Sequence, residues 1–481
     1  MQLPQPFIEN IHRLMGAEEG EQLLNALLAE QPISIRINEE KVSNTSSAPI
    51  YNKVPWCATG CYLDERPTFT FDPLFHAGAY YVQEASSMFV EQALKQYVAQ
   101  PVLMLDLCAA PGGKSTLARS VLPQGSLLVA NEVMRQRAQV LAENLTKWGH
   151  PDVIVTNNDP ADFTQLTDMF DVILTDVPCS GEGMFRKDEV AVSEWSTENV
   201  AICWQRQRRI LADVWPSLKE GGLLIYSTCT YNTQENEENV RWIADEFGAD
   251  ILPLNINAEW GITGNLLPDA DFPVYRFLPH KAQGEGLFLA VLRKKDAFPT
   301  KETRVSSYGN ERSHTRERKA KGKPMQPVFS KEQLLEVSRW IKDDGYELLP
   351  MQGGVLTAFS KQWADELNTL RDARLHILYA GCPLAEVKGK DLLPQHALAM
   401  SNLLASEAFP RVEVGYEQAI AYLRKEAIVL TPDAPRGYLL LTYKNAPIGF
   451  VKNIGNRANN LYPQEWRIRT GYLPEEVRLL Y

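Results

Sequence analysis

The sequence has no long hydrophobic run and no export signal. No apolar stretch approaches the roughly eighteen residues that are needed to span a bilayer. Residues Met1–Pro6 lack both the basic and the apolar segment of a signal peptide. Cysteine is also scarce, and seven thiols, an odd number, do not suggest a disulfide framework. We therefore expect a cytoplasmic protein without a membrane partner.

An excess of positive charge is absent as well. The 481 residues carry a net charge of -11 at pH 7, which is unusual for a protein that binds nucleic acid. Binding to phosphates, however, depends on a local basic face rather than on the total charge. The length allows about three domains. Composition alone therefore leaves the substrate class open.

Alternating apolar runs and helical stretches predict a doubly wound parallel α/β sheet between residues 96 and 293. The expected strands are Val102–Leu107, Ser126–Ala130, Asp152–Thr156, Asp171–Thr175, Gly222–Ser227, Val274–Leu278 and Gly286–Leu292. The expected helices are Lys114–Val121, Met134–Trp148, Val200–Leu218 and Gln234–Phe247. In such sheets, ligands bind beyond the carboxyl ends of the strands.

The segments on either side of this sheet differ from it in pattern. Residues 1–95 combine an expected helix, Ile8–Leu28, with a short strand, Ile33–Asn38. Residues 294–327 have little apolar periodicity, and their first thirty residues carry ten basic and four acidic side chains, a net charge of +6. We interpret this stretch as a flexible linker, although a basic segment also attracts backbone phosphates.

A second folded region is expected over residues 328–481. It begins with a helix at Lys331–Asp343 and contains two short strands, at Gly437–Tyr443 and Ile448–Lys452. The pattern indicates a separate C-terminal region of mixed α and β structure.

The first strand of the predicted sheet runs into a loop of small residues. This loop, Cys108–Lys114, is followed directly by a helix. Its end resembles a P-loop, but Cys108 stands where the first P-loop glycine belongs, and the dinucleotide motif G-x-G-x-x-G does not occur in the chain. S-adenosylmethionine has no phosphates and needs only close approach of the backbone. We therefore expect it as the cofactor, held by Cys108, Ala109, Ala110, Pro111, Gly112, Gly113 and Lys114.

Acidic residues follow the ends of further strands. Glu132 lies 26 residues after Asp106, where a carboxylate can reach ribose hydroxyls. Asp159 follows the third strand, in position to accept a hydrogen bond from an adenine amino group, and Asp176 ends the fourth. One such carboxylate alone is more often a cap or a solvated loop residue. Three of them in register with a glycine loop favour cofactor binding.

Two thiols follow two of the predicted strands. Cys179 comes after Asp171–Thr175, and Cys229 comes after Gly222–Ser227. Both should face one crevice at the carboxyl edge of the sheet, where a thiol pair suggests covalent catalysis. The alternative is that both are buried and behave as small hydrophobic residues. The polar residues and the glycine beside Cys179 argue against that alternative.

Three motifs together resemble the Sun/Nop-type RNA (cytosine-5)-methyltransferases. They are Cys-Ala-Ala-Pro-Gly-Gly-Lys at 108–114, Asp-Val-Pro-Cys-Ser-Gly at 176–181 and Ser-Thr-Cys-Thr at 227–230. Residues 35–38 and 78–88 are similar to the family's N-terminal RNA-binding module and to its segment before the cofactor loop. The C-terminal third resembles the RsmF-type 16S rRNA branch, whose tail carries a PUA-like RNA-binding domain, at residues 391–399, 422–424, 447–452 and 459–463.

This resemblance implies a fold, a substrate and a role for each site residue. The fold would be a Rossmann-like class I methyltransferase core between an N-terminal RNA-binding module and a C-terminal α+β/PUA-like region. Cys229 would attack carbon 6 of cytosine, and Cys179 would help to remove the carbon 5 proton. Asp176, when protonated, would hydrogen-bond the ring nitrogen and also touch the cofactor. The implied substrate is 16S rRNA near the decoding centre, in a small subunit or an assembly intermediate, bound by a monomer without a metal.

Other functions stay open at this point. A cytosine-5 methyltransferase of the same family could act on tRNA or another rRNA. A ribosome-assembly factor could bind RNA without catalysis, although nothing would then require Cys179, Cys229, Glu132 and Asp159 together. An adenine or glutamine N-methyltransferase on this fold is disfavoured, because residues 176–179 do not supply the Asn-Pro-Pro-Tyr type of motif.

Overall fold

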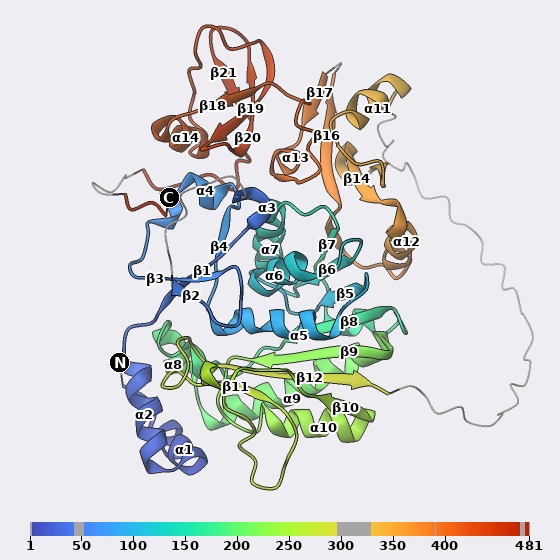
Figure 1. Ribbon diagram of the computed structural model, residues 1–481. Helices are drawn as coiled ribbons and strands as arrows, with labels where there is room; N and C mark the ends of the chain where they lie inside the picture. Colours follow the sequence, from blue (N-terminus) through green and yellow to red (C-terminus); the bar gives the residue numbers. More distant parts are fainter. Residues whose placement is uncertain (1, 43–51, 296–328, 390, 472–476, 481) are drawn as a thin grey trace, which may run out of the picture.

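The computed structural model describes residues 2–42, 52–295, 329–389, 391–471 and 477–480 (Figure 1). A nine-stranded sheet is accompanied by one four-stranded sheet from the N-terminal segment and two from the C-terminal region. The expected basic linker falls almost entirely outside the described residues. Within these ranges, no helix is long and apolar enough to cross a membrane.

The nine-stranded central sheet confirms the expected α/β architecture. Its strand order is β10-β12-β9-β8-β5-β6-β7-β15, and β11 pairs with β12. Strands β5 to β9 run parallel, whereas the other four pair antiparallel with their neighbours. The bounds are β5 Leu103–Asp106, β6 Leu127–Asn131, β7 Val153–Thr156, β8 Phe170–Asp176, β9 Leu218–Thr228, β10 Ala249–Leu252, β11 Tyr275–Phe277, β12 Leu287–Lys294 and β15 Ile377–Ala380.

Helices cover both faces of this sheet (Figure 1). Successive side chains of a strand point to opposite faces, so Met104 packs with one layer while Leu103 and Leu105 pack with the other. The first layer contains α5 Val90–Tyr97, α6 Gly113–Val121 and α7 Arg135–Trp148. The second layer contains α9 Thr197–Val214 and α10 Glu237–Phe247, and the short α8, Glu189–Glu194, precedes α9.

Two expected helices end earlier than the sequence suggested. The helix expected to reach Leu218 stops at Val214, because Pro216 lies in the following turn and Leu218 already begins β9. The helix expected over Lys331–Asp343 is α11, Lys331–Ser338.

The single helix expected over Ile8–Leu28 is wrong. Gly16 adopts a φ of +80° and separates α1, Gln5–Met15, from α2, Ala17–Leu28. This backbone angle lies in a region that glycine enters at low cost, so the chain reverses here. The N-terminal sheet that follows has the order β2-β3-β1-β4, with β1 Ile33–Ile37, β2 Asn52–Lys53, β3 Gly60–Leu63 and β4 Tyr80–Val82. The short helices α3 Glu39–Val42 and α4 Pro73–His76 lie between its strands.

The C-terminal region completes the central sheet. Strand β15 pairs antiparallel with β7, although more than 200 residues separate the two in the chain. The preceding helix α12, Ala364–Asp372, buries Leu367 and Leu370 in the same apolar layer as α9 and α10. The third sheet, β13-β14-β16-β17, consists of β13 Tyr346–Pro350, β14 Val355–Ser360, β16 Cys382–Lys388 and β17 Asp391–Pro394.

The last sheet packs on the N-terminal segment. It has the order β18-β19-β20-β21, made of β18 Arg411–Glu413, β19 Gly437–Tyr443, β20 Ala446–Asn453 and β21 Ala458–Asn460, with α13 His396–Met400 before it and α14 Tyr416–Leu423 within it. Leu74 and Tyr80 share an apolar cluster with Tyr422 and Tyr462. The N-terminal sheet and the last sheet therefore pack against each other through one apolar cluster.

The packing of α12 predicts a large effect of one substitution. Leu370→Ala should lower the free energy of unfolding by about 2–5 kcal/mol, because Leu370 is fully buried and its truncation opens a cavity. Leu335→Ala on α11 is the control, since Leu335 is 58% exposed, and it should change stability by less than about 0.5 kcal/mol. Urea unfolding followed by tryptophan fluorescence measures both. Equal effects would show that α12 is not part of the folded core.

Candidate active site

Hydrogen bonds with neighbouring residues hold the small-residue loop after β5 in place. Ala109 N–H donates to Asn131 O at 2.8 Å, and the carbonyls of Ala110 and Pro111 accept from Arg137 and Asn144, each at 2.8 Å. Gly112 has a φ of +113°, and a Cβ there would lie 3.2 Å from a methyl group of Leu141. The loop backbone is thus fixed before any ligand binds.

The two acidic residues expected near ribose and adenine do not line the cavity that holds most of the other expected site residues. Glu132 is buried, accepts from Met134 N–H at 2.9 Å and pairs with Arg137 at 3.3 Å. Asp159 is exposed and accepts from Ala161 N–H at 3.1 Å, which is a cap. Neither lines the cavity described below.

Asn131 forms hydrogen bonds at the ends of three strands. This residue was not identified from the sequence. Its side-chain amide donates to Leu107 O at 3.1 Å and to Asn158 O at 3.0 Å. Its carbonyl oxygen accepts from Thr156 Oγ1 at 2.9 Å and from Asn158 N–H at 3.0 Å. A buried amide with all these groups satisfied fixes the ends of β5, β6 and β7 relative to one another.

The two thiols expected to face one crevice are in contact. The sulfur atoms of Cys179 and Cys229 are 3.2 Å apart, and Cys229 N–H points at the Cys179 sulfur at 3.4 Å. The pKa of Cys179 is raised well above its usual value, first by the hydrogen bond with Cys229 and then by burial. Cys179 therefore holds its proton in this state.

A buried polar network joins the two loops that carry these thiols. Glu182 accepts from Tyr231 N–H at 2.7 Å and from Asn232 N–H at 3.0 Å. Glu235 accepts from Ser180 N–H at 3.0 Å and from the Asn232 amide at 2.8 Å. Sequence reasoning missed these residues, because polar side chains after a strand usually read as a solvated loop. Here they position both thiols.

Asp176 occupies the point between the two thiol loops and the cofactor loop. Its carboxylate accepts from Lys114 Nζ and from Ser227 Oγ, each at 2.8 Å. Burial lowers the pKa of Lys114, but the charge and hydrogen bond of Asp176 outweigh it, so the pKa is raised overall. The charge of a Cys229 thiolate contributes in the same direction. Lys114 is therefore a fixed cation beside the thiols.

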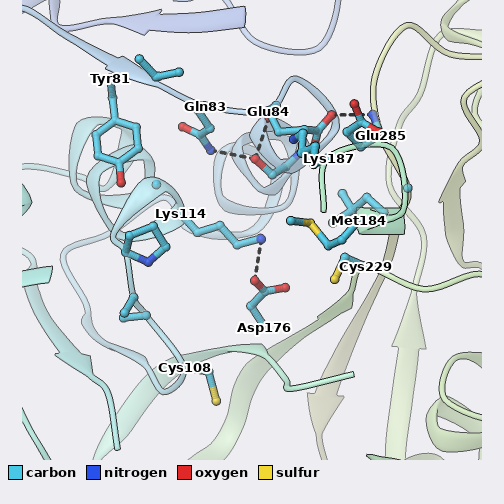
Figure 2. Close-up of a pocket in the computed structure, with 18 residues that line it drawn as sticks. Tyr81, Gln83, Glu84, Cys108, Lys114, Asp176, Met184, Lys187, Cys229 and Glu285 are labelled. Carbon is cyan, nitrogen blue, oxygen red and sulfur yellow. Dashed lines mark hydrogen bonds and ion pairs between the residues drawn. The ribbon is translucent and has the colours of Figure 1, made fainter. Parts of the chain in front are cut away.

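A cavity of about 310 Å³ connects these groups (Figure 2). Eight of the expected site residues line it: Cys108, Ala109, Ala110, Pro111, Gly113, Lys114, Asp176 and Cys229. Gly112, Cys179, Glu132 and Asp159 are not among the residues that line it. Figure 2 shows Lys114 reaching Asp176, with Cys108 and Cys229 on either side. Ten further lining residues were not assigned to the site from the sequence: Tyr81, Val82, Gln83, Glu84, Ser87, Met184, Lys187, Glu285, Gly286 and Leu287.

The cavity fits a cofactor that approaches the backbone closely. Its volume is at the lower end of the range of small-molecule sites, about 300–1,000 Å³. A Cβ on Gly113 would lie 3.4 Å from the ring of Tyr81, so a larger side chain would narrow the space. The segment Tyr81–Ser87 that forms the opposite wall lies within 78–88, which carried part of the family resemblance.

The last residue of β5, Asp106, carries a buried carboxyl group just before the cofactor loop. Asp106 is fully buried; Oδ2 accepts from Ser115 Oγ at 2.6 Å, and Oδ1 has no partner among the described residues. Burial raises the pKa of Asp106 to about 7, although the Ser115 hydrogen bond opposes this.

This shift predicts a pH-dependent effect of Asp106→Asn. Between pH 3.8, the ordinary pKa of an aspartate, and about pH 7, the native state binds the proton that the unfolded state has lost. The stability of the parent protein relative to the variant should therefore fall with rising pH, by at most about 1.4 kcal/mol per pH unit, and level off above pH 7. Urea unfolding of both proteins between pH 5 and pH 8 measures this. Parallel stability profiles would contradict a raised pKa.

Comparison with known proteins places the chain in a family. Residues 95–293 match the model described as 16S rRNA methyltransferase RsmB/F. Residues 3–85 match the N-terminal domain of 16S rRNA methyltransferase RsmF, and residues 409–468 match the methyltransferase RsmF PUA domain. The three models follow one another along the chain in the order of the expected regions.

Relatives cover almost the whole length. Ribosomal RNA small subunit methyltransferase F of Cronobacter sakazakii is 30% identical over 98% of this chain and 97% of that protein. The protein of the same name from Erwinia tasmaniensis is 29% identical over 98% of both. A methyltransferase homologue from Pyrococcus horikoshii, of known crystal structure, is 28% identical, covers 60% of this chain and 95% of its own, and has a TM-score of 0.52. The chain therefore belongs to the RsmF family of S-adenosylmethionine-dependent 16S rRNA methyltransferases.

Proposed function

We propose that this chain methylates carbon 5 of a cytosine in 16S rRNA near the decoding centre, through a covalent bond between Cys229 and carbon 6. The observation that carries the proposal is the 3.2 Å contact between the Cys179 and Cys229 sulfur atoms beside Lys114 and Asp176. Transfer to an oxygen or a nitrogen atom needs no thiol pair, because those atoms are already nucleophilic. Carbon 5 of cytosine is not nucleophilic, and covalent addition of a thiolate to the ring makes it so.

The proposed reaction begins with a bond between Cys229 and the base and ends with the cleavage of that bond. The Cys229 thiolate adds to carbon 6, and the electrons of the 5,6 double bond make carbon 5 nucleophilic. S-adenosylmethionine, when bound, would supply an electrophilic methyl group, and its sulfonium would leave as the neutral sulfide of S-adenosylhomocysteine when the bond from sulfur to the methyl group breaks. After carbon 5 has accepted the methyl group, a base takes its proton, the 5,6 double bond forms again and the bond to the Cys229 sulfur breaks. The target base must leave its stack to enter the cavity.

Cys179 is the proposed base of the last step. The hydrogen bond with Cys229 is the largest cause of its raised pKa, and the charge of Cys229 adds to it. Once the Cys229 sulfur is bonded to carbon, it is neutral and both effects weaken. Cys179 then loses its proton more easily, at the stage where a base is required. Burial keeps the thiol protonated before that stage.

Lys114 is proposed to stabilise the negative charge of the Cys229 thiolate, and Asp176 is proposed to position the target base. The Lys114 ammonium attracts the Cys229 thiolate, which explains why the thiolate contributes to the raised pKa of Lys114. Asp176 is proposed to hydrogen-bond the ring nitrogen of the base in protonated form. Both Asp176 oxygens accept hydrogen bonds without the base, so binding of the base requires the release of Lys114 or Ser227.

The cofactor is proposed to lie along residues 108–114, on the side of the cavity away from Cys229. Close approach of the backbone favours its amino-acid end there. Glu132 and Asp159 are proposed to bind its ribose and adenine. Glu132 would have to bind the ribose while it remains paired with Arg137. Asp159 would bind the adenine with the carboxylate oxygen that does not accept from Ala161 N–H.

RNA is proposed to be bound by modules on both sides of the catalytic residues. We propose an N-terminal module at 1–95, a methyltransferase domain at 96–293, a linker at 294–327 and a C-terminal region at 328–481, acting as a monomer. On an acidic chain, affinity for RNA must come from several local contacts. The substrate is proposed to be a small subunit or a late assembly intermediate rather than tRNA.

Gly113→Val tests the cofactor site. The new side chain should narrow the cavity against Tyr81 and weaken S-adenosylmethionine binding at least about tenfold, as overpacking at a close contact does. Gly264→Val is the control, because a Cβ at Gly264 meets nothing within 4 Å. Calorimetry measures one site in the parent protein and in the control. Tight binding of ATP with no binding of S-adenosylmethionine would contradict the site and favour the P-loop alternative.

Substitution of each cysteine tests the division of labour. Cys229→Ala should abolish methylation and form no adduct, because the carbon 6 bond cannot form. Cys179→Ala should accumulate a protein–RNA adduct that survives denaturation, because addition proceeds and elimination fails. Denaturing gels with labelled 16S rRNA measure the adduct, and Cys203→Ala, at a buried thiol outside the cavity, is the control. An adduct in the Cys229 variant but not in the Cys179 variant would reverse the roles.

A further inference from the structure

A second pocket lies in the last sheet, outside the proposed active site. It has a volume of about 190 Å³ and is formed by the loop 429–436 and the turn 453–457, which joins β20 to β21. Its lining includes the guanidinium-bearing residues Arg436 and Arg457 and the hydroxyl-bearing Thr431. This lining is polar and contains no carboxylate. The pocket therefore presents donors and positive charge.

The walls of the pocket are fixed by one buried side chain. The Asn453 amide donates to Ala434 O at 3.1 Å and to Pro435 O at 3.0 Å, which anchors the loop. Its carbonyl oxygen accepts from Gly455 N–H at 3.0 Å, which anchors the turn. Asn453 is 7% exposed, so these hydrogen bonds are shielded from water. The loop and the turn are therefore held in a fixed relative position without a ligand.

The turn places the first arginine against backbone. Gly455 has a φ of +102°, and a Cβ there would lie 2.9 Å from a guanidinium nitrogen of Arg436. A larger residue at position 455 would displace this guanidinium. No ion pair of Arg436 or Arg457 is found among the described residues. Asp433, the carboxylate of the loop, instead accepts a hydrogen bond from Thr431.

Exposed aliphatic residues stand at the rim of this pocket. Val429, which lines it, is 75% exposed, the highest value among the exposed large hydrophobic residues of the described chain. Ile454, in the turn, is 39% exposed. Aliphatic surface beside two arginines matches the composition of a nucleotide, whose phosphate is charged and whose sugar and base have apolar faces.

We propose that this pocket binds a nucleotide of the rRNA substrate, with its phosphate between Arg436 and Arg457 and its sugar or base against Val429 and Ile454. The inference rests on the proposed function in one respect, namely that the RNA is ribosomal. Two guanidinium groups in a small polar pocket suit a phosphate, because each can donate two parallel hydrogen bonds. The pocket would hold the RNA at a distance from the reacting base and so contribute affinity rather than chemistry.

Surface variants of the full chain test the pocket. Removal of the C-terminal region is unsuitable, because β15 and α12 belong to the central sheet. The test variant is Arg436→Gln with Arg457→Gln. The control is Arg411→Gln with Arg469→Gln, which removes the same charge from exposed positions in the same region. A third variant, Val429→Ser, removes apolar contact without changing the charge.

The measurements are filter binding of protein-free 16S rRNA at several KCl concentrations, methylation kinetics and calorimetry with S-adenosylmethionine. The test variant should bind rRNA more weakly and lower the slope of log K against log salt by about one, for the one lost phosphate contact. KM for RNA should rise severalfold, with kcat and cofactor affinity unchanged. Val429→Ser should weaken binding equally at all salt concentrations, and the control should change the slope less than the test variant.

Several outcomes would overturn the inference. One is a test variant with the binding slope and KM of the parent protein. Another is a variant that loses affinity for the ribosomal subunit but not for protein-free rRNA, since the pocket would then bind an acidic segment of a ribosomal protein. Failure of the proposed function looks different: the parent protein would methylate no rRNA cytosine at carbon 5, while the arginine variant would still lose its salt-dependent RNA binding.

Discussion

The parallel register of β8 and β9 is the constraint on which the site depends. Asp176 pairs with Ser227 across these strands, and their side chains meet in a 2.8 Å hydrogen bond. Cys179 follows three residues after Asp176, and Cys229 follows two residues after Ser227. A slip of one residue would turn each side chain of the slipped strand to the opposite face of the sheet. The contact of the two thiols is thus set by the ladder of backbone hydrogen bonds below them.

Buried carboxylates then hold the loops that the register has brought together. Glu182 accepts two backbone hydrogen bonds from the opposite loop and one from the Trp195 indole. Glu235 accepts one from the backbone of the opposite loop, at Ser180, and one from the Gln207 amide on α9. A buried charge is costly unless it is well satisfied, so these loops can adopt few other conformations. The result is a preorganised thiol pair beside Lys114, whose charge needs no rearrangement before a thiolate forms. Stability and chemistry therefore depend on the same hydrogen bonds.

Local patterns predicted the central strands and much of the cavity wall, because strand ends and small-residue loops obey short-range rules. Asp176, Cys229 and residues 108–114 except Gly112 are the expected residues that line the cavity. The break at Gly16 needed a backbone angle that no apolar pattern specifies. Strand β15 has only four residues, and its place is decided by pairing with β7 rather than by its own sequence. Asn131, Glu182 and Glu235 were missed because burial, not residue type, gives them their role.

The late position of β15 in the chain has a consequence for biosynthesis. Until residues 377–380 have been made, β7 is the outermost strand of the sheet and its outer hydrogen-bonding groups have no partner. Its residues Val153, Ile154 and Val155 are apolar and are buried in the finished protein. An apolar edge of this kind is a template for pairing with other chains. The nascent chain therefore carries an aggregation-prone edge through the synthesis of more than 200 residues, and its own C-terminal region removes that hazard.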